Sequence, residues 1–400
     1  MWLKRFWVHN RTLLIYVFVT YLDKVLIFLL PILVLYIAGD ETSYNTVEYI
    51  CSIANIIVPF LTFISSYAFY GYKTAENKSY FTNSYICYSS VSTLVVGALT
   101  LFIAFILRIF NVKGTEELET FIAIRTMFYL FVQYVNSYYR LIDNPVRSLI
   151  YSILINIASA ITICLLTVMK MPYIVGAFFY PETLSGVMAV VLFLKNRHYF
   201  QIKDYGRFIL ESIKFAWPIV MNSTAVAFVA NYGKVYAFNF LTSYEMYCLS
   251  FVLRIAMILQ MAHTSVISFF SKDIYLKGYS KKFLYSYISI IGVSFVGTLF
   301  VLIGYNSFFA RQVVPLNLTT WLVFLYTIIH MIAAALEINF GRNNKNIYIF
   351  IIASISCIVY LSLIFVIGVQ NTAQLALYMV IYMLTYLILL IVTWRNVLSK

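Results

Sequence analysis

A small set of ionisable side chains lies inside long apolar runs of this 400-residue chain. Four are cations: Lys24, Arg125, Lys234 and Arg254. Five more could take up or release a cation: Asp23, Glu182, His263, His330 and Glu337. A charge at the centre of a bilayer costs roughly 2.5–3.5 kcal/mol on insertion scales, so such residues persist where they pair, face water or do work.

The four cations could bind an anionic ligand. Arginine presents a rigid fork that matches two phosphate oxygens, and lysine acts as a point charge. Arg254 lies deep within its apolar run, so we expect its guanidinium to face an internal aqueous cavity. For Arg125 and Lys234, extension of the side chain towards the outer headgroups is an alternative.

The acidic residues and histidines are candidates for coupling to an ion, with structural ion pairs as the alternative. Asp23 and Lys24 are adjacent and about 100° apart on a helix, so both cannot face lipid. They would then pair with each other, and Glu182 would pair with a neighbouring cation. A lone buried histidine more often has a structural partner, which is the alternative for His263 and His330.

The elements that carry these residues are predicted to be membrane-spanning helices. The chain is 62% hydrophobic and 11% charged, with a mean hydropathy of +0.88. About 20 apolar residues cross a hydrocarbon core of ~30 Å, and runs of this length exclude the ~10-residue alternating segments of a bacterial outer-membrane barrel. We predict an all-α integral membrane protein with spans at residues 12–38, 47–72, 85–107, 121–139, 149–169, 173–194, 215–240, 244–270, 284–304, 318–340, 347–369 and 375–394.

The charge pattern predicts orientation. Lys and Arg concentrate in alternate connections, whereas the others contain only Arg108, Lys113, Lys170 and Arg311. Because basic residues stay on the cytoplasmic side, both termini are predicted to be cytoplasmic. The net charge of +13 therefore reflects membrane topology, and no nucleic-acid partner is expected.

The predicted spans divide into two six-helix bundles, residues 1–200 and 201–400. A polar stretch at residues 195–214 is predicted to be a surface-lying amphipathic helix joining them. The tripeptide Thr42-Ser43-Tyr44 recurs as Thr242-Ser243-Tyr244, each time after the first span of a bundle. This pattern favours a parallel repeat, typical of transporters that rock two bundles about a central site, although a duplicated bundle without transport would look alike.

No Walker A loop, HExxH, GxSxG or Rossmann fingerprint is present, and the cysteines lie in apolar runs without metal-ligand spacing. We therefore expect no enzymatic activity, no bound metal and no cofactor. A proton or sodium gradient could supply the energy for transport.

Two regions carry a family resemblance. They are Gly39-Asp40-Glu41-Thr42-Ser43-Tyr44 after the first span, and Lys214-Phe215-Ala216-Trp217-Pro218 with Asn231-Tyr232-Gly233-Lys234 and Leu241-Thr242-Ser243-Tyr244-Glu245 in and after the seventh. With them the chain resembles the polysaccharide flippases of the MOP superfamily, relatives of the MATE transporters (multidrug and toxin extrusion). Asn45 stands where that family typically has glycine.

The resemblance implies a bacterial inner-membrane protein that moves undecaprenyl-diphosphate-linked oligosaccharide units outwards for O-antigen or capsule. It implies alternating access around a cationic cavity, exchange with protons or sodium, and membrane lipids and a polysaccharide polymerase of the same pathway as partners. By this logic Lys24, Arg125, Lys234 and Arg254 would contact the substrate. A membrane polysaccharide polymerase or ligase, which would need a large outer loop, and another ion-coupled transporter are the alternatives.

Overall fold

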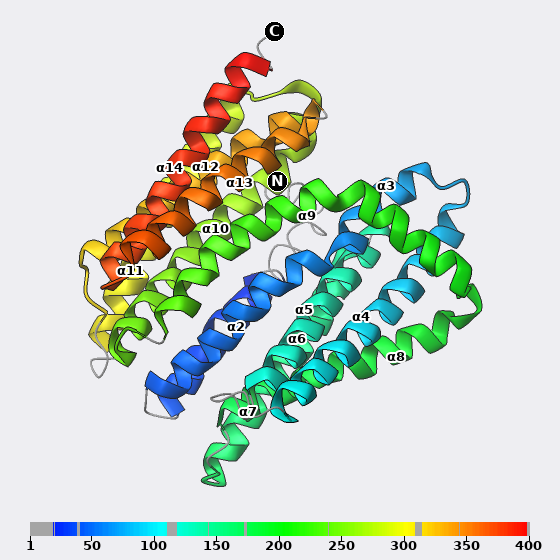
Figure 1. The fold of residues 1–400 in the computed structure, drawn as a ribbon, viewed down its shortest axis with the longest axis horizontal. Coiled ribbons are helices and arrows are strands. Elements are labelled where there is room, and N and C mark those ends of the chain that lie inside the picture. The colour runs from blue at the N-terminus through cyan, green and yellow to red at the C-terminus, as the bar shows by residue number, and fades with distance from the viewer. Residues whose placement is uncertain are drawn as a thin grey trace, which may run out of the picture. The chain divides into compact units, whose positions relative to one another are not determined.

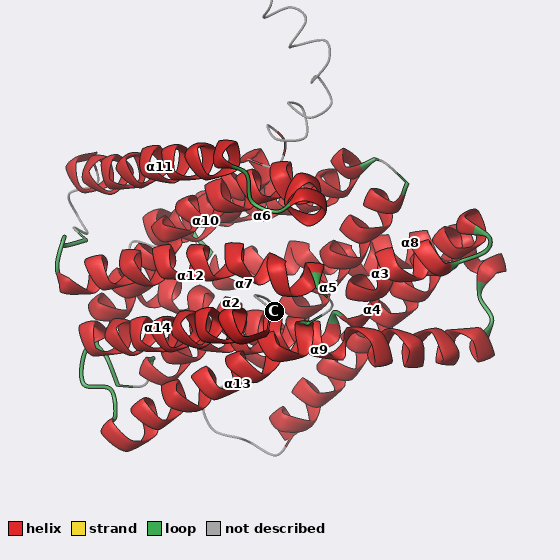
Figure 2. Cartoon of the chain, turned by 90° about the horizontal axis from the view of Figure 1, so that it is seen from above, coloured by secondary structure: helices red, strands yellow, loops and turns green. Residues whose placement is uncertain are grey.

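The computed structural model describes residues 19, 21–37, 41–109, 118–142, 144–171, 174–238, 240–308, 314–343 and 345–397. Figure 2 shows these residues as helices joined by loops, with no strand among them. Eleven of the described helices are long and apolar enough to cross a membrane. Part of the first predicted span, residues 12–18, lies outside the described residues, as do Lys113 and Arg311. The predicted all-helical membrane architecture is confirmed.

The chain divides into two compact units, Met1–Val220 and Met221–Lys400. The first contains a helix over residues 21–37 and the elements α2 (Glu41–Leu61), α3 (Phe63–Thr74), α4 (Lys78–Ile109), α5 (Leu118–Leu141), α6 (Pro145–Val168), α7 (Ile174–Phe179), η1 (Tyr180–Thr183), α8 (Leu184–Asn196), η2 (Arg197–Tyr199) and the first part of α9 (Ile202–Ala237). Helix α5 packs against α2, α3, α4, α6 and α8, so it is the centre of this unit (Figure 1).

Two prolines interrupt the helices of the first unit. The backbone oxygen of Pro59 accepts hydrogen bonds from the amide (3.2 Å) and the hydroxyl (2.7 Å) of Thr62, where α2 gives way to α3. The predicted span at 173–194 is also broken, since Pro181 has no N–H to continue α7 and a 3-10 turn, η1, follows. This turn places Glu182 in the interior of the unit.

The second unit contains the rest of α9, then α10 (Ser243–Lys277), α11 (Lys281–Phe308), α12 (Leu318–Arg342), α13 (Asn346–Ser362), the π-helical turn η3 (Leu363–Ile367) and α14 (Thr372–Val397). Helix α12 packs extensively on α14 and also contacts α10 and α13. Buried side chains of these helices form the core, among them the rings of Phe324, Tyr360, Tyr382 and Tyr386.

Helix α9 differs from the prediction. We expected a surface helix at residues 195–214 and a separate span at residues 215–240, but one helix runs from Ile202 to Ala237 with Pro218 inside it. Its first half packs on the first unit through Phe208, which makes an edge contact with the Tyr67 ring at 5.6 Å. The division between the two compact units falls after Val220, inside this helix.

Candidate substrate and ion-coupling sites

A buried ion pair lies in the first unit. The Arg125 guanidinium on α5 donates to a carboxylate oxygen of Glu182 on η1, and the two residues are only 4% and 1% exposed. The hydroxyl of Ser185 donates to the backbone oxygen of Glu182 at 2.6 Å and so holds the turn that presents the carboxylate. Glu182 therefore has the cationic partner that was its predicted structural alternative.

Aromatic rings surround the guanidinium of this pair. Phe128 and Tyr129 follow Arg125 by three and four residues, so they share its helix face. The guanidinium carbon lies 4.1 Å from the Tyr129 ring centre and 5.4 Å from those of Phe128 and Phe178, and Nη2 donates to the Tyr129 hydroxyl at 2.5 Å. These cation–π contacts stabilise the charge where water is excluded. Arg125 thus points into the protein and does not extend towards a headgroup.

Asp23 and Lys24 differ in their surroundings. The Asp23 side chain is buried against Ser152 of α6, whose hydroxyl also accepts from the Asn156 amide at 3.3 Å. The Lys24 ammonium lies 3.9 Å from an Asp23 oxygen, and its side chain is 44% exposed. The adjacent charges do pair, but at the long limit of a salt bridge. Ser152 of α6 is thus a second polar neighbour of the Asp23 carboxylate.

In the second unit, Glu337 is bound by a tyrosine. The Tyr386 hydroxyl on α14 donates to a Glu337 carboxylate oxygen on α12 at 2.6 Å. The Tyr382 ring lies 6.2 Å from that of Tyr386 and 6.2 Å from that of Tyr360, so three buried tyrosines extend from this carboxylate. No salt bridge to Glu337 occurs among the described residues.

The two histidines lie on neighbouring helices. His263 Nδ1 of α10 shares a hydrogen bond of 2.7 Å with the Tyr287 hydroxyl of α11, which itself donates to the backbone oxygen of Met331 at 3.2 Å. The His330 ring stacks on Tyr326 with centres 6.3 Å apart, and it is near enough to His263 for an electrostatic interaction. Both histidines have local partners, as their structural alternative predicted.

The remaining two predicted cations also lie in the second unit. Arg254 on α10 is only 8% exposed and is flanked along the helix by the buried Leu249–Phe251 and Ile255 positions. Lys234, near the end of α9, is half-buried, and both cations interact with other residues. Arg254 is therefore interior, and the aqueous cavity expected beside it stays a prediction. The predicted cations are divided between the units: Lys24 and Arg125 in the first, Lys234 and Arg254 in the second.

Tyrosine hydroxyls are the part of these sites that sequence reasoning missed. Tyr129, Tyr287 and Tyr386 bind Arg125, His263 and Glu337. Only Tyr129 had a sequence signal, because it lies one helical turn from its partner. The others come from different helices in a chain with 35 tyrosines, so no spacing distinguishes them.

The described residues contain no group of three or more His, Cys, Asp and Glu side chains that could hold a metal ion. Both units instead hold charged side chains in their interior, among them Arg125 with Glu182 in the first and Arg254 in the second.

Comparison with known proteins defines the fold. No family model and no curated protein matches the chain. A multidrug resistance transporter of the MATE family of the MOP superfamily, in an inward-facing conformation, aligns with a TM-score of 0.54 at 13% identity, covering 93% of each chain. The MATE multidrug transporter DinF-BH, in a ligand complex, aligns with a TM-score of 0.53 at 14% identity, covering 96% of this chain and 93% of that one. The chain therefore has a MATE-like fold, and the predicted likeness to the MOP superfamily is confirmed at the level of fold.

Proposed function

We propose that this protein is a flippase that moves undecaprenyl-diphosphate-linked oligosaccharide units across the bacterial inner membrane for O-antigen or capsule synthesis. The observation that carries the proposal is a MATE-like fold with cations kept inside both of its units, Arg125 in one and Arg254 in the other. Fold alone does not define a substrate. The interior cations support an anionic substrate, because arginine matches the oxygens of a diphosphate. The lipid-linked oligosaccharide comes from the resemblance to polysaccharide flippases.

In this proposal the two units rearrange so that the substrate site opens alternately to the cytoplasm and to the outside. Lys24, Arg125, Lys234 and Arg254 neutralise the diphosphate while it crosses. Since Arg125 lies in a closed ion pair with Glu182, the substrate would replace that carboxylate as its partner. Asp23, Glu182, His263, His330 and Glu337 are the candidates for coupling the movement to protons or sodium.

Deleting the gene and locating the lipid-linked unit tests this function. The expected result is that complete units accumulate on the cytoplasmic leaflet, where added periplasmic hydrolases or lectins cannot reach them, and that surface polymer disappears. Single units that still arrive on the surface without being polymerised would make the protein a polymerase. Normal surface polymer would point to a transporter of another substrate.

A second test uses the purified protein in vesicles. A fluorescent lipid-linked oligosaccharide is placed on both leaflets, and the fraction that an external glycosidase can cut is measured over time. With wild-type protein and an ion gradient, the protected fraction should fall. In vesicles that contain the Arg254→Ala variant at equal protein content, the protected fraction should stay constant.

A further inference from the structure

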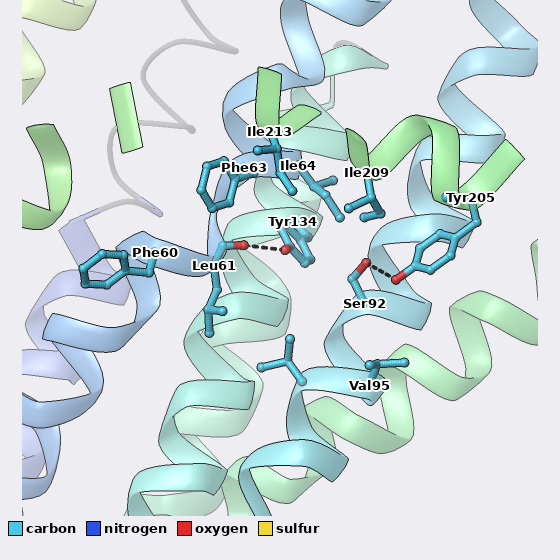
Figure 3. Close-up of a pocket in the computed structure, with 12 residues that line it drawn as sticks. Phe60, Leu61, Phe63, Ile64, Ser92, Val95, Tyr134, Tyr205, Ile209 and Ile213 are labelled. Carbon is cyan, nitrogen blue, oxygen red and sulfur yellow. Dashed lines mark hydrogen bonds between the residues drawn. The ribbon is translucent and has the colours of Figure 1, made fainter. Parts of the chain in front are cut away.

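An open groove of about 410 Å³ lies in the first unit, between α9 and the helices α3, α4 and α5. In Figure 3, Ile209 and Ile213 of α9 lie above it, Ile64 of α3 lines its upper wall, and Val95 of α4 lies at its lower end. The volume is within the range of ~300–1,000 Å³ that is typical of ligand sites. The groove is thus large enough to hold part of a ligand and is framed by helices that could span the membrane.

The polar groups in the wall of the groove already have partners. The hydroxyls of Ser92 and Tyr205 share a hydrogen bond of 2.9 Å, and the Tyr134 hydroxyl donates to the backbone oxygen of Leu61 at 2.7 Å (Figure 3). A ligand here gains little from its own polar atoms, because these hydroxyls are occupied, and it would desolvate them without replacement. The groove therefore selects a hydrocarbon chain.

The face of α9 next to the groove carries cations. Tyr205, Gly206, Ile209 and Ile213 share the groove face, whereas Lys203, Arg207 and Lys214 are spaced by four and seven residues and share an adjacent, exposed face. The acidic residues Asp204 and Glu211 lie beyond this stripe, farther from the groove face. Glu211 contacts Arg207 at 3.3 Å and accepts from Tyr67 at 3.2 Å.

We propose that the groove binds the hydrocarbon tail of the lipid diphosphate, with its phosphates at Lys203, Arg207 and Lys214. This inference rests on the proposed flippase function and adds a loading site to it. An apolar slot beside a stripe of three cations complements a molecule that joins a long tail to two adjacent phosphates. Arg207 already has Glu211 as a counter-charge, whereas Lys203 and Lys214 have no salt bridge among the described residues. An ordinary phospholipid carries a single phosphodiester and would neutralise only one of these two lysines.

Gly206 is a position in the groove wall where a side chain can be added. A Cβ atom added at Gly206 meets no other atom within 4 Å, and the residue lines the groove. Gly206→Leu therefore places a branched side chain where the tail would lie. Gly292 on α11 is a matched control, since a Cβ atom there also meets nothing within 4 Å.

The experiment uses the full chain in phosphatidylcholine vesicles and a polyprenyl diphosphate with a diazirine at the end of its tail. After illumination, labelled peptides are mapped. In the wild type, label is expected on α4 and α9, at positions around Val95 and Ile209. Gly206→Leu should raise the apparent Kd for this label about tenfold, equivalent to ~1.4 kcal/mol, while Gly292→Leu leaves it unchanged.

Competition distinguishes the two sources of such a lipid. Unlabelled polyprenyl diphosphate should remove the groove label, and an equal concentration of phosphatidylglycerol should not. Equal competition by phosphatidylglycerol would overturn the proposal and make the groove a site for membrane phospholipid. Label that is absent from α4 and α9, or that is unchanged in both Gly206→Leu and Val95→Phe, would overturn it as well.

Comparison with the flipping assay separates this inference from the proposed function. Groove labelling without any flipping of the lipid-linked oligosaccharide would support the lipid-diphosphate site but refute the flippase function. Flipping without groove labelling would keep the flippase and refute the site. Thermal unfolding of each variant in the same vesicles identifies any that fail to fold, and Val95→Phe fills the groove from the opposite wall if Gly206→Leu is one of them.

Discussion

Replacing Glu182 by glutamine tests how much the buried ion pair with Arg125 stabilises the first unit. Glutamine keeps the shape of the side chain but leaves the guanidinium charge without its counter-charge. Loss of one partner of a buried pair costs roughly 3–5 kcal/mol. The rings of Phe128, Tyr129 and Phe178 still face the guanidinium and contribute about 2 kcal/mol in a desolvated site. We therefore expect a loss near the low end, about 3 kcal/mol.

The assay is reversible unfolding in bicelles. Steric trapping monitors it and gives the free energy of unfolding without heating. Glu76→Gln is the control, because Glu76 is exposed in the connection between α3 and α4. The double variant Arg125→Met with Glu182→Leu should return to within about 1 kcal/mol of the wild type, since apolar replacement of a whole buried pair is often neutral.

The double variant also separates stability from transport. If Arg125 contacts the substrate as proposed, this variant folds normally and does not flip lipid-linked oligosaccharide. A Glu182→Gln protein as stable as the wild type would refute the reasoning, because it would show that Arg125 has no need of the carboxylate.

The other predictions concern the second unit and the interior cations. Gly233→Ala should destabilise the protein by about 1–3 kcal/mol, because a Cβ atom there would lie 2.6 Å from a hydroxyl of α13 and a methyl of α14. Gly292→Ala, with open space, should stabilise its helix by about 0.5–1 kcal/mol in the same unfolding assay. Glu337→Gln should make flipping independent of the ion gradient while the protein still folds, and an unchanged gradient dependence would exclude it as the coupling residue. Arg254→Ala should abolish flipping, whereas alanine at the exposed Lys195 should not; equal activity at equal membrane levels would count against a substrate role for Arg254.

The sequence was sufficient for the helices and the membrane environment. Runs of about 20 apolar residues have few alternative explanations, so the spans could be predicted individually. The breaks at Pro59 and Pro181 follow from the missing N–H of proline. Their consequences could not be predicted, because whether a proline bends a helix, ends it or is tolerated, as Pro218 is in α9, depends on what packs around it.

The sequence could not predict which side chains pair with each other inside each unit. Arg125 and Glu182 are 57 positions apart, and Tyr386 and Glu337 are 49 apart. Helix periodicity relates residues three or four positions apart and says nothing of contacts between helices. A buried charge predicts that a partner exists, because an isolated charge is too costly, but packing decides which residue it is.

Glu182 and Glu337 are therefore not equivalent candidates for ion coupling. The Glu182 charge is balanced by a guanidinium that cannot lose its proton, so binding H⁺ or Na⁺ there would leave Arg125 without a counter-charge. Glu337 accepts a hydrogen bond from the neutral Tyr386 hydroxyl and has no salt bridge within the described part of the chain. A small cation at Glu337 would add the missing positive charge and release no partner. If the protein exchanges a small cation for a substrate, as proposed, Glu337 in the second unit is the more favourable site for that cation. In the proposed function Arg125 would bind the anionic substrate, whose arrival would free Glu182.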